Sequence, residues 1–325
     1  MSEHSQHMEH DRGSWGSNFG FLMAAVGSAV GLGNIWGFPY KMGSYGGFAF
    51  LVIYLLLVIF FGVVVMLGEL SIGRKTGLGA VGAYAKLGKK YKWIGMLGIL
   101  AAFCLLAFYN VLGGLVMRYM FGFILQILGV DGFAGQSGNF FGYILHDYSG
   151  MVFFHVLFIV CNVVIVMGGI QGGIEKFCTV AMPALFFMLL FVIIYVAFQP
   201  GAGQGYKDML TPNFEPISSF SGFLQVLSKA AGQMFFSLSL GMGAIISYGS
   251  YLDKKENLQK NALIIPACDT LIAVMAACAV LPACAAFGME YNQGPGLLFN
   301  TMQNVFLSMG SFGSFVGFMF YFLVF

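Results

Sequence analysis

The stretch GSAVGLGNIWGFPY, residues 27–40, lies at the end of an uncharged segment, residues 19–40, that is long enough to cross a lipid bilayer. It contains four glycines, an asparagine and a proline, all of which weaken a helix. Unsatisfied backbone groups are costly in lipid. Two interpretations remain open: the small residues allow close helix packing, or the helix is broken where it lines a cavity inside the protein.

The composition places this segment in a membrane protein. The chain is 59% hydrophobic and 9% charged, whereas soluble domains carry about 25% charged residues. A bilayer span needs roughly 20 apolar residues. The segments that meet this length are residues 19–40, 47–67, 93–117, 151–170, 177–198, 230–252 and 262–287, and an eighth begins near Met309. The sequence therefore predicts an all-α membrane protein.

The basic residues predict its orientation. Lys and Arg cluster between the second and third segments and again after the sixth, whereas residues 130–150 contain neither. By the positive-inside rule, the N-terminus is cytoplasmic. Residues 1–18 are polar and form a cytoplasmic tail rather than a cleaved signal, because no short apolar core with a cleavage site follows. Residues 19–325 form one multi-pass domain in the plasma membrane.

Several features carry no separate function. The histidines at 4, 7 and 10 belong to the polar tail, and the six cysteines all lie in apolar spans without a CxxC pair. A net charge of +2 reflects the loop bias and gives no indication of a nucleic-acid partner. No set of nucleophile, base and orienting residue is recognisable, so we expect no enzymatic activity.

A second interrupted span decides between the two interpretations of the first. The stretch GQMFFSLSLGMGAI, residues 232–245, mixes serine and glycine with aromatic residues in the middle of the sixth segment. Broken helices five spans apart are typical of inverted-repeat transporters, in which the substrate and ions bind at the bilayer midplane.

The same residues resemble a known family. AVGLGNIWGFPY, GGIQGGIEKF with AMPALF, and GQMFFSLSLGMGAIISYGSY are similar to helices 1, 5 and 6 of the neurotransmitter:sodium symporters, above all the bacterial amino-acid transporters. The resemblance runs from about Arg12 to Phe325. It implies a five-plus-five inverted-repeat fold with broken helices 1 and 6, of which about eight helices are present. The sequence stops in apolar residues, so we expect a fragment that ends within helix 8 and that does not drive uptake alone.

The resemblance also implies the binding sites. The substrate would contact Ala29, Leu32, Gly33, Leu105, Tyr109, Phe236, Ser237, Ser239 and Met242. A first sodium would bind Ala29, Asn34, Ser237 and a residue of helix 7, and a second would bind the carbonyls of Gly27 and Val30 with oxygens from helix 8. The gates would include Arg12, Trp15, Tyr109 and Phe236.

Two departures from the family pattern bear on function. Gly31 stands where monoamine-transporting relatives have an aspartate, which favours a substrate that brings its own carboxylate. Gly37 replaces an arginine of the outer gate, so the usual ion pair of that gate cannot form. With apolar pocket walls and a flexible Met242, the substrate is expected to be a neutral, hydrophobic amino acid, aromatic ones included.

Asp269 is an ionisable residue within the seventh segment, where function is the default interpretation. Counting from helix 6 aligns it with the family's sodium-ligating asparagine, whereas counting back from Pro282 aligns Cys268 instead. Tyr54, Gln233 and Ser237 match other positions of the family's chloride site. We expect Asp269 to supply the negative charge as a direct ligand of the first sodium, so that chloride is not required.

The predicted function is sodium-coupled symport of a neutral amino acid by alternating access, with the lipid bilayer as surroundings. Two alternatives stay open. One is a membrane protein that binds the substrate without transporting it. The other is a proton-coupled amino-acid permease of a related fold, in which Asp269 would titrate.

Overall fold

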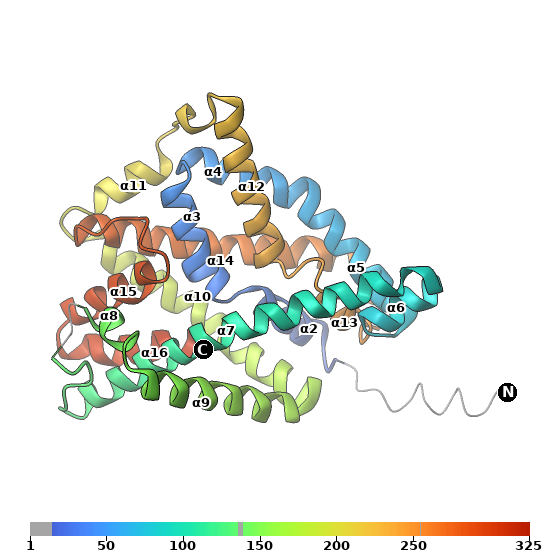
Figure 1. Cartoon of the computed structure of the whole chain (residues 1–325), viewed down its shortest axis with the longest axis horizontal. Helices are drawn as coiled ribbons and strands as arrows, with labels where there is room; N and C mark the ends of the chain where they lie inside the picture. Colours follow the sequence, from blue (N-terminus) through green and yellow to red (C-terminus); the bar gives the residue numbers. More distant parts are fainter. Residues whose placement is uncertain (1–14, 136–138, 254) are drawn as a thin grey trace.

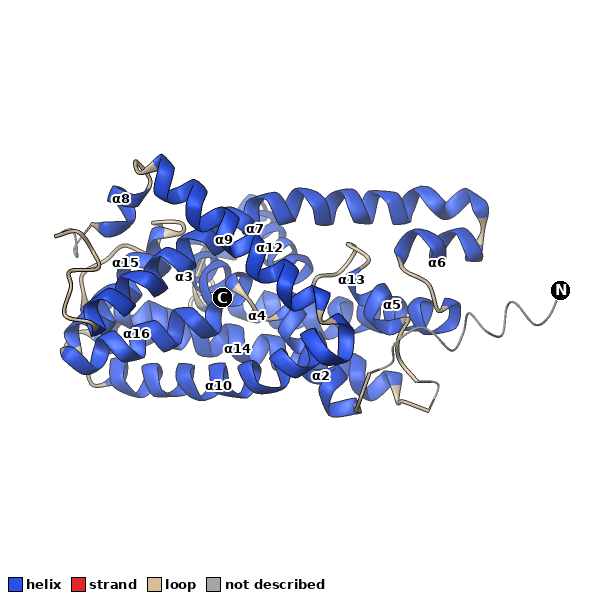
Figure 2. Cartoon of the chain, turned by 90° about the horizontal axis from the view of Figure 1, so that it is seen from below, coloured by secondary structure: helices blue, strands red, loops and turns tan. Residues whose placement is uncertain are grey.

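The computed structural model describes residues 15–135, 139–253 and 255–325, and these are helices joined by short loops, without strands (Figure 2). Arg12 and Lys254 lie outside the described residues. Five helices are long and apolar enough to cross a membrane, or six if a bent pair counts as one span. The unbroken spans are α4–η2–α5 (Phe48–Leu57, Val58–Gly62, Val63–Thr76), α7 (Lys92–Ile127), α9 (Tyr148–Met167), η4–α10 (Ile170–Glu175, Lys176–Ala197) and α14 (Leu258–Ala286).

The bent pair is the first predicted span. Helix α2 (Asn18–Ala29) is followed by a π-helical turn, η1 (Gly33–Gly37), and by α3 (Phe38–Ser44), and the two halves meet at 50°. Ser17 begins α2, because its hydroxyl accepts a hydrogen bond from the Gly20 N–H at 2.9 Å. Helix 1 is therefore broken at residues 30–32, as predicted.

The sixth predicted span is also broken, but its first boundary was wrong. Helix α12 (Phe220–Ser237) begins ten residues before the predicted start at residue 230, and α13 (Ala244–Gly249) follows the break. Ser219 caps α12 by accepting a hydrogen bond from the Gly222 N–H. The first turns of α12 contain Gln225 and Lys229, and this polarity hides them from a search for apolar segments.

Shorter helices complete the chain. Helix α16 (Ser311–Val324) matches the eighth segment, whereas α15 (Gly296–Ser308) before it was not predicted. The remaining short helices lie in connections that were expected to be loops: α6 (Ala80–Leu87), η3 (Lys89–Tyr91), α8 (Phe140–Ile144), α11 (Ala202–Leu210) and η5 (Glu215–Ile217).

The packing surrounds α14 and the broken helix 1 with the other spans (Figure 1). In its most apolar window, 61% of α14 is buried within the protein, whereas none of the corresponding window of α9 is buried. Helix α14 contacts α2, η1 and α3, and α10 packs against both α14 and α2. The most enclosed helix thus lies directly against the break in helix 1.

Candidate functional site

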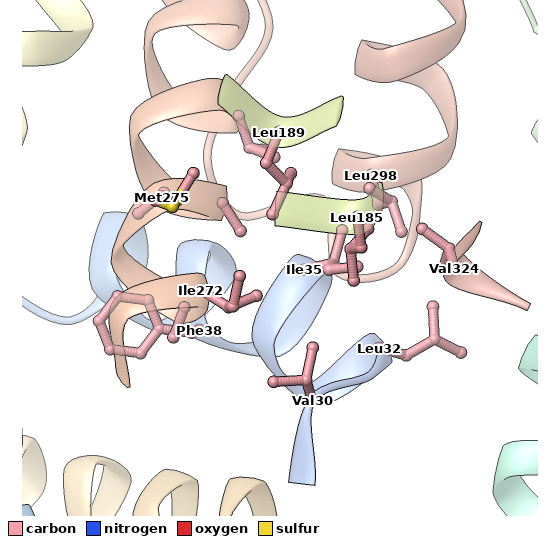
Figure 3. Close-up of a cluster of buried hydrophobic side chains, with 14 of the residues drawn as sticks. Val30, Leu32, Ile35, Phe38, Leu185, Leu189, Ile272, Met275, Leu298 and Val324 are labelled. Atoms are coloured by element: carbon pink, nitrogen blue, oxygen red, sulfur yellow. The ribbon is translucent and has the colours of Figure 1, made fainter. Parts of the chain in front are cut away.

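The break in helix 1 is stabilised by one of its own side chains. Helical hydrogen bonding resumes after the break where the N–H groups of Asn34 and Ile35 donate to the Gly31 carbonyl at 3.0 and 3.1 Å. The Asn34 side-chain oxygen accepts from the Gly31 N–H at 3.1 Å. Figure 3 shows Val30 and Leu32 at the break, among side chains from α10, α14 and α16. Irregular backbone at this depth is thus buried in protein, as lipid requires.

The glycines of helix 1 serve different purposes. A Cβ atom on Gly27 would lie 2.8 Å from the Cys178 sulfur, so Gly27 permits close packing against α10. A Cβ on Gly31 would meet nothing within 4 Å. Both interpretations of the opening stretch are therefore correct, each for a different glycine.

The break in helix 6 has a different backbone conformation from the break in helix 1. Residues 238–243 connect α12 to α13, with positive φ angles at Ser239 (53°), Gly241 (79°) and Gly243 (78°). The Gly241 N–H donates to a Glu69 carboxylate oxygen at 2.7 Å. The Ser239 hydroxyl donates to the Ser28 carbonyl at 3.3 Å, so the two breaks touch.

Three predicted sodium residues meet in a buried cluster between the breaks. The Asn34 amide nitrogen donates to Asp269 Oδ1 at 2.7 Å and to the Asp269 carbonyl at 3.0 Å. The Ser237 hydroxyl donates to both oxygens of the same carboxylate, at 2.9 and 3.2 Å. Asp269 is fully buried, whereas Cys268 is partly exposed. The alignment that places Asp269, rather than Cys268, opposite Asn34 is therefore the one the fold adopts.

Further oxygens surround this carboxylate. The hydroxyls of Tyr54 and Thr270 are buried beside it and make no hydrogen bond of ordinary geometry. Buried polar groups are normally paired. A hard cation takes oxygen ligands of this kind, so the residues fit a sodium ion. Gln233 matches another position of the predicted chloride site. Its amide nitrogen donates to the Gly33 carbonyl at 2.8 Å instead of to the Asp269 carboxylate.

A cavity of about 260 Å³ opens beside both breaks. Tyr109 and Phe236 both line it and contact each other, with ring centroids 5.7 Å apart, and the Tyr109 hydroxyl lies at the Gly33 N–H. The predicted residues that line it are Gly27, Ala29, Val30, Leu32, Leu105, Tyr109, Phe236 and Ser239, whereas Gly33 and Ser237, predicted to contact the substrate, are not among its lining residues.

Met242 does not line this cavity, contrary to the prediction. It lies in a separate depression with Ile99, Ala102 and residues 78–82. The positive φ angles on either side of Met242, at Gly241 and Gly243, turn the chain toward α6. Val116 and Phe158, which were not predicted, provide apolar wall instead.

Of the residues predicted to form the cytoplasmic gate, Trp15 is among the described residues and Arg12 is not. Trp15 donates through its indole nitrogen to the Tyr248 carbonyl at 3.4 Å. Two further charged residues contact this region and were not predicted from the sequence. Glu69 accepts a hydrogen bond from the Gly241 N–H, and Lys41 donates one to the Gln233 side-chain oxygen. Glu69 lies two residues past the predicted segment of residues 47–67, but the span in the structure continues to Thr76 and includes it, and an acid in a span is a signal of function.

These features agree with the comparisons to known proteins. The model of the sodium:neurotransmitter symporter family matches residues 12–130 and 145–325. The chain belongs to this family.

Individual relatives support the same family assignment. An uncharacterized sodium-dependent transporter of Bacillus subtilis, YhdH, is 36% identical over 95% of this chain and 68% of its own length. One from Haemophilus influenzae is 34% identical over 91% of this chain and 66% of its own length. The crystal structure of MhsT in complex with L-phenylalanine is 37% identical, with a TM-score of 0.88 over 96% of this chain and 70% of that chain. The chain thus spans about two thirds of the length of these relatives.

Proposed function

We propose that this protein is a sodium-coupled symporter of neutral, hydrophobic amino acids that works by alternating access in the plasma membrane. The observation that carries the proposal is the buried Asn34–Ser237–Asp269 cluster, which joins the break in helix 1 to the end of α12. The domain of residues 19–325 would hold the substrate and ions, and the N-terminal tail would face the cytoplasm.

Sodium would bind at this cluster, with Ala29 as a further carbonyl ligand. Asp269 receives hydrogen bonds from Asn34 and Ser237 on both carboxylate oxygens. Hydrogen bonds donated to a carboxylate stabilise its charged form. An ionised Asp269 would supply the negative charge beside sodium without chloride, and the uptake experiment below separates sodium coupling from the proton-coupled alternative.

The amino acid would bind in the 260 Å³ cavity. Its carboxylate would face the N–H groups of Leu32 and Gly33 and the Tyr109 hydroxyl. Its ammonium would face the carbonyls of Ala29, Phe236 and Ser237 and the hydroxyl of Ser239. The open space above Gly31 leaves room for the carboxylate end. A second sodium would bind the carbonyls of Gly27 and Val30, which border the same cavity.

The apolar wall supports a hydrophobic side chain on the substrate. Leu105, Val116, Phe158 and Phe236 face the cavity, and burial of apolar surface contributes about 25 cal/mol per Å². The phenylalanine in the MhsT structure, a relative 37% identical to this chain, is consistent with this class.

Binding of radiolabelled L-phenylalanine to the purified protein tests the proposal. We expect saturable binding that requires sodium and persists when gluconate replaces chloride. Asp269→Asn should weaken the apparent sodium affinity and introduce chloride dependence, because a neutral amide cannot supply the negative charge. Loss of wild-type binding in gluconate would contradict the role of Asp269.

Uptake into proteoliposomes separates transport from binding. For a full-length protein that contains residues 1–325, we expect accumulation under an inward sodium gradient and none under a proton gradient alone, whereas residues 1–325 by themselves are expected not to drive uptake. Sodium-dependent binding without uptake would support the alternative of a non-transporting binding protein, and uptake driven by protons alone would support the permease.

A further inference from the structure

Helix 1 has no charged residue at the outer-gate position, Gly37, but a lysine, Lys41, lies one helical turn further along the chain. Gly37 stands where the family resemblance places an arginine. Lys41 follows it by four residues, and such positions share one face of a helix. A Cβ atom on Gly37 would lie 3.3 Å from the Gln233 side-chain oxygen. The Lys41 ammonium reaches that same oxygen, at 2.7 Å. Positions 37 and 41 therefore converge on one amide of α12.

Gln233 connects Lys41 to the break. It is fully buried, its oxygen accepts from Lys41, and its nitrogen donates to the Gly33 carbonyl at 2.8 Å. Lys41 and Gly33 both belong to the second half of helix 1, and Gln233 belongs to α12. The amide thus ties the outer half of helix 1 to helix 6 at two points.

Lys41 also contacts the ring of Phe236, one of the residues that line the cavity. Its ammonium lies 5.7 Å from the centroid of the Phe236 ring. Within that distance a cation is attracted to the face of an aromatic ring. Phe236 lines the cavity and packs against Tyr109, which lines it too. One ammonium therefore acts on the backbone of the break, through Gln233, and on an aromatic residue of the cavity wall.

In the described part of the chain, no carboxylate forms an ion pair with this ammonium. Among the described residues, the one ion pair is Arg118 with Asp147, on other helices. The charged neighbour of Lys41 is Lys229, which lies over the Tyr45 ring at 5.1 Å. Lys41 is also partly buried. A solvated surface lysine would not need a buried amide and an aromatic ring as partners.

We propose that Lys41 is the outer latch of this transporter: its ammonium holds Phe236 and Gln233 over the bound substrate, in place of the arginine that Gly37 lacks. The inference rests on the proposed function, because a latch needs a bound substrate to retain. Lys41 acts through Gln233 and Phe236 and is a positioning residue.

The rate at which bound, radiolabelled L-phenylalanine dissociates in sodium tests this role. Lys41→Met and Lys41→Gln should each accelerate dissociation by about tenfold or more, while the sodium concentration for half-saturation stays within about twofold of wild type. Lys41→Arg should dissociate at close to the wild-type rate. Lys229→Met is the matched control, since it removes a neighbouring lysine over an aromatic ring that has no contact with the cavity, and it should leave the rate unchanged.

A relocated charge makes the test sharper. Gly37→Arg combined with Lys41→Met should restore slow dissociation, because position 37 points at the same amide. Lys41→Gln keeps a polar side chain, so it provides the test if the methionine variant does not fold. Wild-type dissociation rates in Lys41→Gln would overturn the latch. A wild-type protein that binds no amino acid in sodium would overturn the proposed function itself, and the latch with it.

Discussion

Each of the two breaks frees a backbone N–H from helical hydrogen bonding, and the two breaks pair that N–H with different side chains. In helix 1, the chain bends by 50° at ordinary backbone angles, and the Asn34 side chain binds the freed Gly31 N–H. In helix 6, the chain turns through positive φ angles, and the Glu69 carboxylate binds the freed Gly241 N–H. The first break is stabilised by an amide of its own helix, and the second by a carboxyl group from another helix.

This difference assigns different properties to the two halves of the site. The first break is unstrained, and Gly31 faces open cavity. The second break contains a non-glycine residue at positive φ, Ser239, and such strain costs about 1–3 kcal/mol and persists where the surroundings enforce it. We expect substitutions in helix 1 to affect mainly binding and those in helix 6 to affect mainly stability.

The largest effect is expected at Gly31. Gly31→Leu places a side chain into the cavity without touching protein atoms near the Cβ position. Amino-acid binding should weaken by more than about 100-fold, which corresponds to about 2.7 kcal/mol. Equilibrium binding in sodium measures the loss, and thermal unfolding in detergent should be nearly unchanged.

Gly68→Leu is the control for this variant. Gly68 is exposed on α5, and a Cβ there also meets nothing within 4 Å. Its binding should equal that of wild type. Retained binding in Gly31→Leu would show that the substrate does not occupy the space above this break.

The next effect is expected at Glu69. Glu69→Ala removes the acceptor of the buried Gly241 N–H, and an unpaired buried donor costs about 1–3 kcal/mol. Glu69→Gln keeps an acceptor oxygen, and the oxygen that it replaces has no hydrogen-bond partner. Thermal unfolding should therefore rank wild type close to Glu69→Gln and well above Glu69→Ala. Equal losses in both variants would show that the charge, rather than the hydrogen bond, stabilises the break.

A smaller effect is expected at Ser239. Ser239→Gly relieves the positive φ but loses the hydroxyl bond to Ser28, whereas Ser239→Ala loses the bond and keeps the strain. The glycine variant should be more stable than the alanine variant by about 1–2 kcal/mol. If the two variants unfold at the same temperature, the second break stores no strain at this residue.

The breaks were predictable because their residues conflict with their surroundings. Glycine, serine and asparagine inside an apolar span contradict the helix that the span requires, and this conflict located both breaks. Helix boundaries were less predictable: the polar first turns of α12 and the whole of α15 lack an uninterrupted apolar segment. The length of an apolar segment cannot separate a helix that polar residues interrupt from a loop, whether that helix is buried, as α15 is, or partly exposed, as the first turns of α12 are.

The candidate site was predictable in its chemistry more than in its shape. Asp269 is conspicuous as an acid in a span, and the fold places it against Asn34 and Ser237. The position of Met242 depends on the φ angles on either side of it, which a sequence pattern does not specify. Lys41 was missed because lysine near the end of an apolar segment is ordinary, and only the three-dimensional contact with Gln233 distinguishes it.

The smallest effect is expected at an ordinary helix start, which provides a baseline for the two breaks. Asp147 caps α9 by accepting from the Gly150 N–H at 3.0 Å, and it pairs with Arg118 at 2.5 Å. The Gly150 hydrogen bond and then Arg118 lower the pKa of Asp147 in the folded protein. A lowered pKa stabilises the fold above the ordinary value of about 3.9, and this stability is lost as the pH falls through the folded-state pKa. The difference in unfolding temperature between wild type and Asp147→Asn should therefore be small at pH 6 and should shrink toward pH 3. Added salt should reduce it as well, because the carboxylate is partly exposed. A difference that grows on acidification would show that the pKa of Asp147 is raised rather than lowered by folding, and the Arg118 pair could not then serve as the baseline.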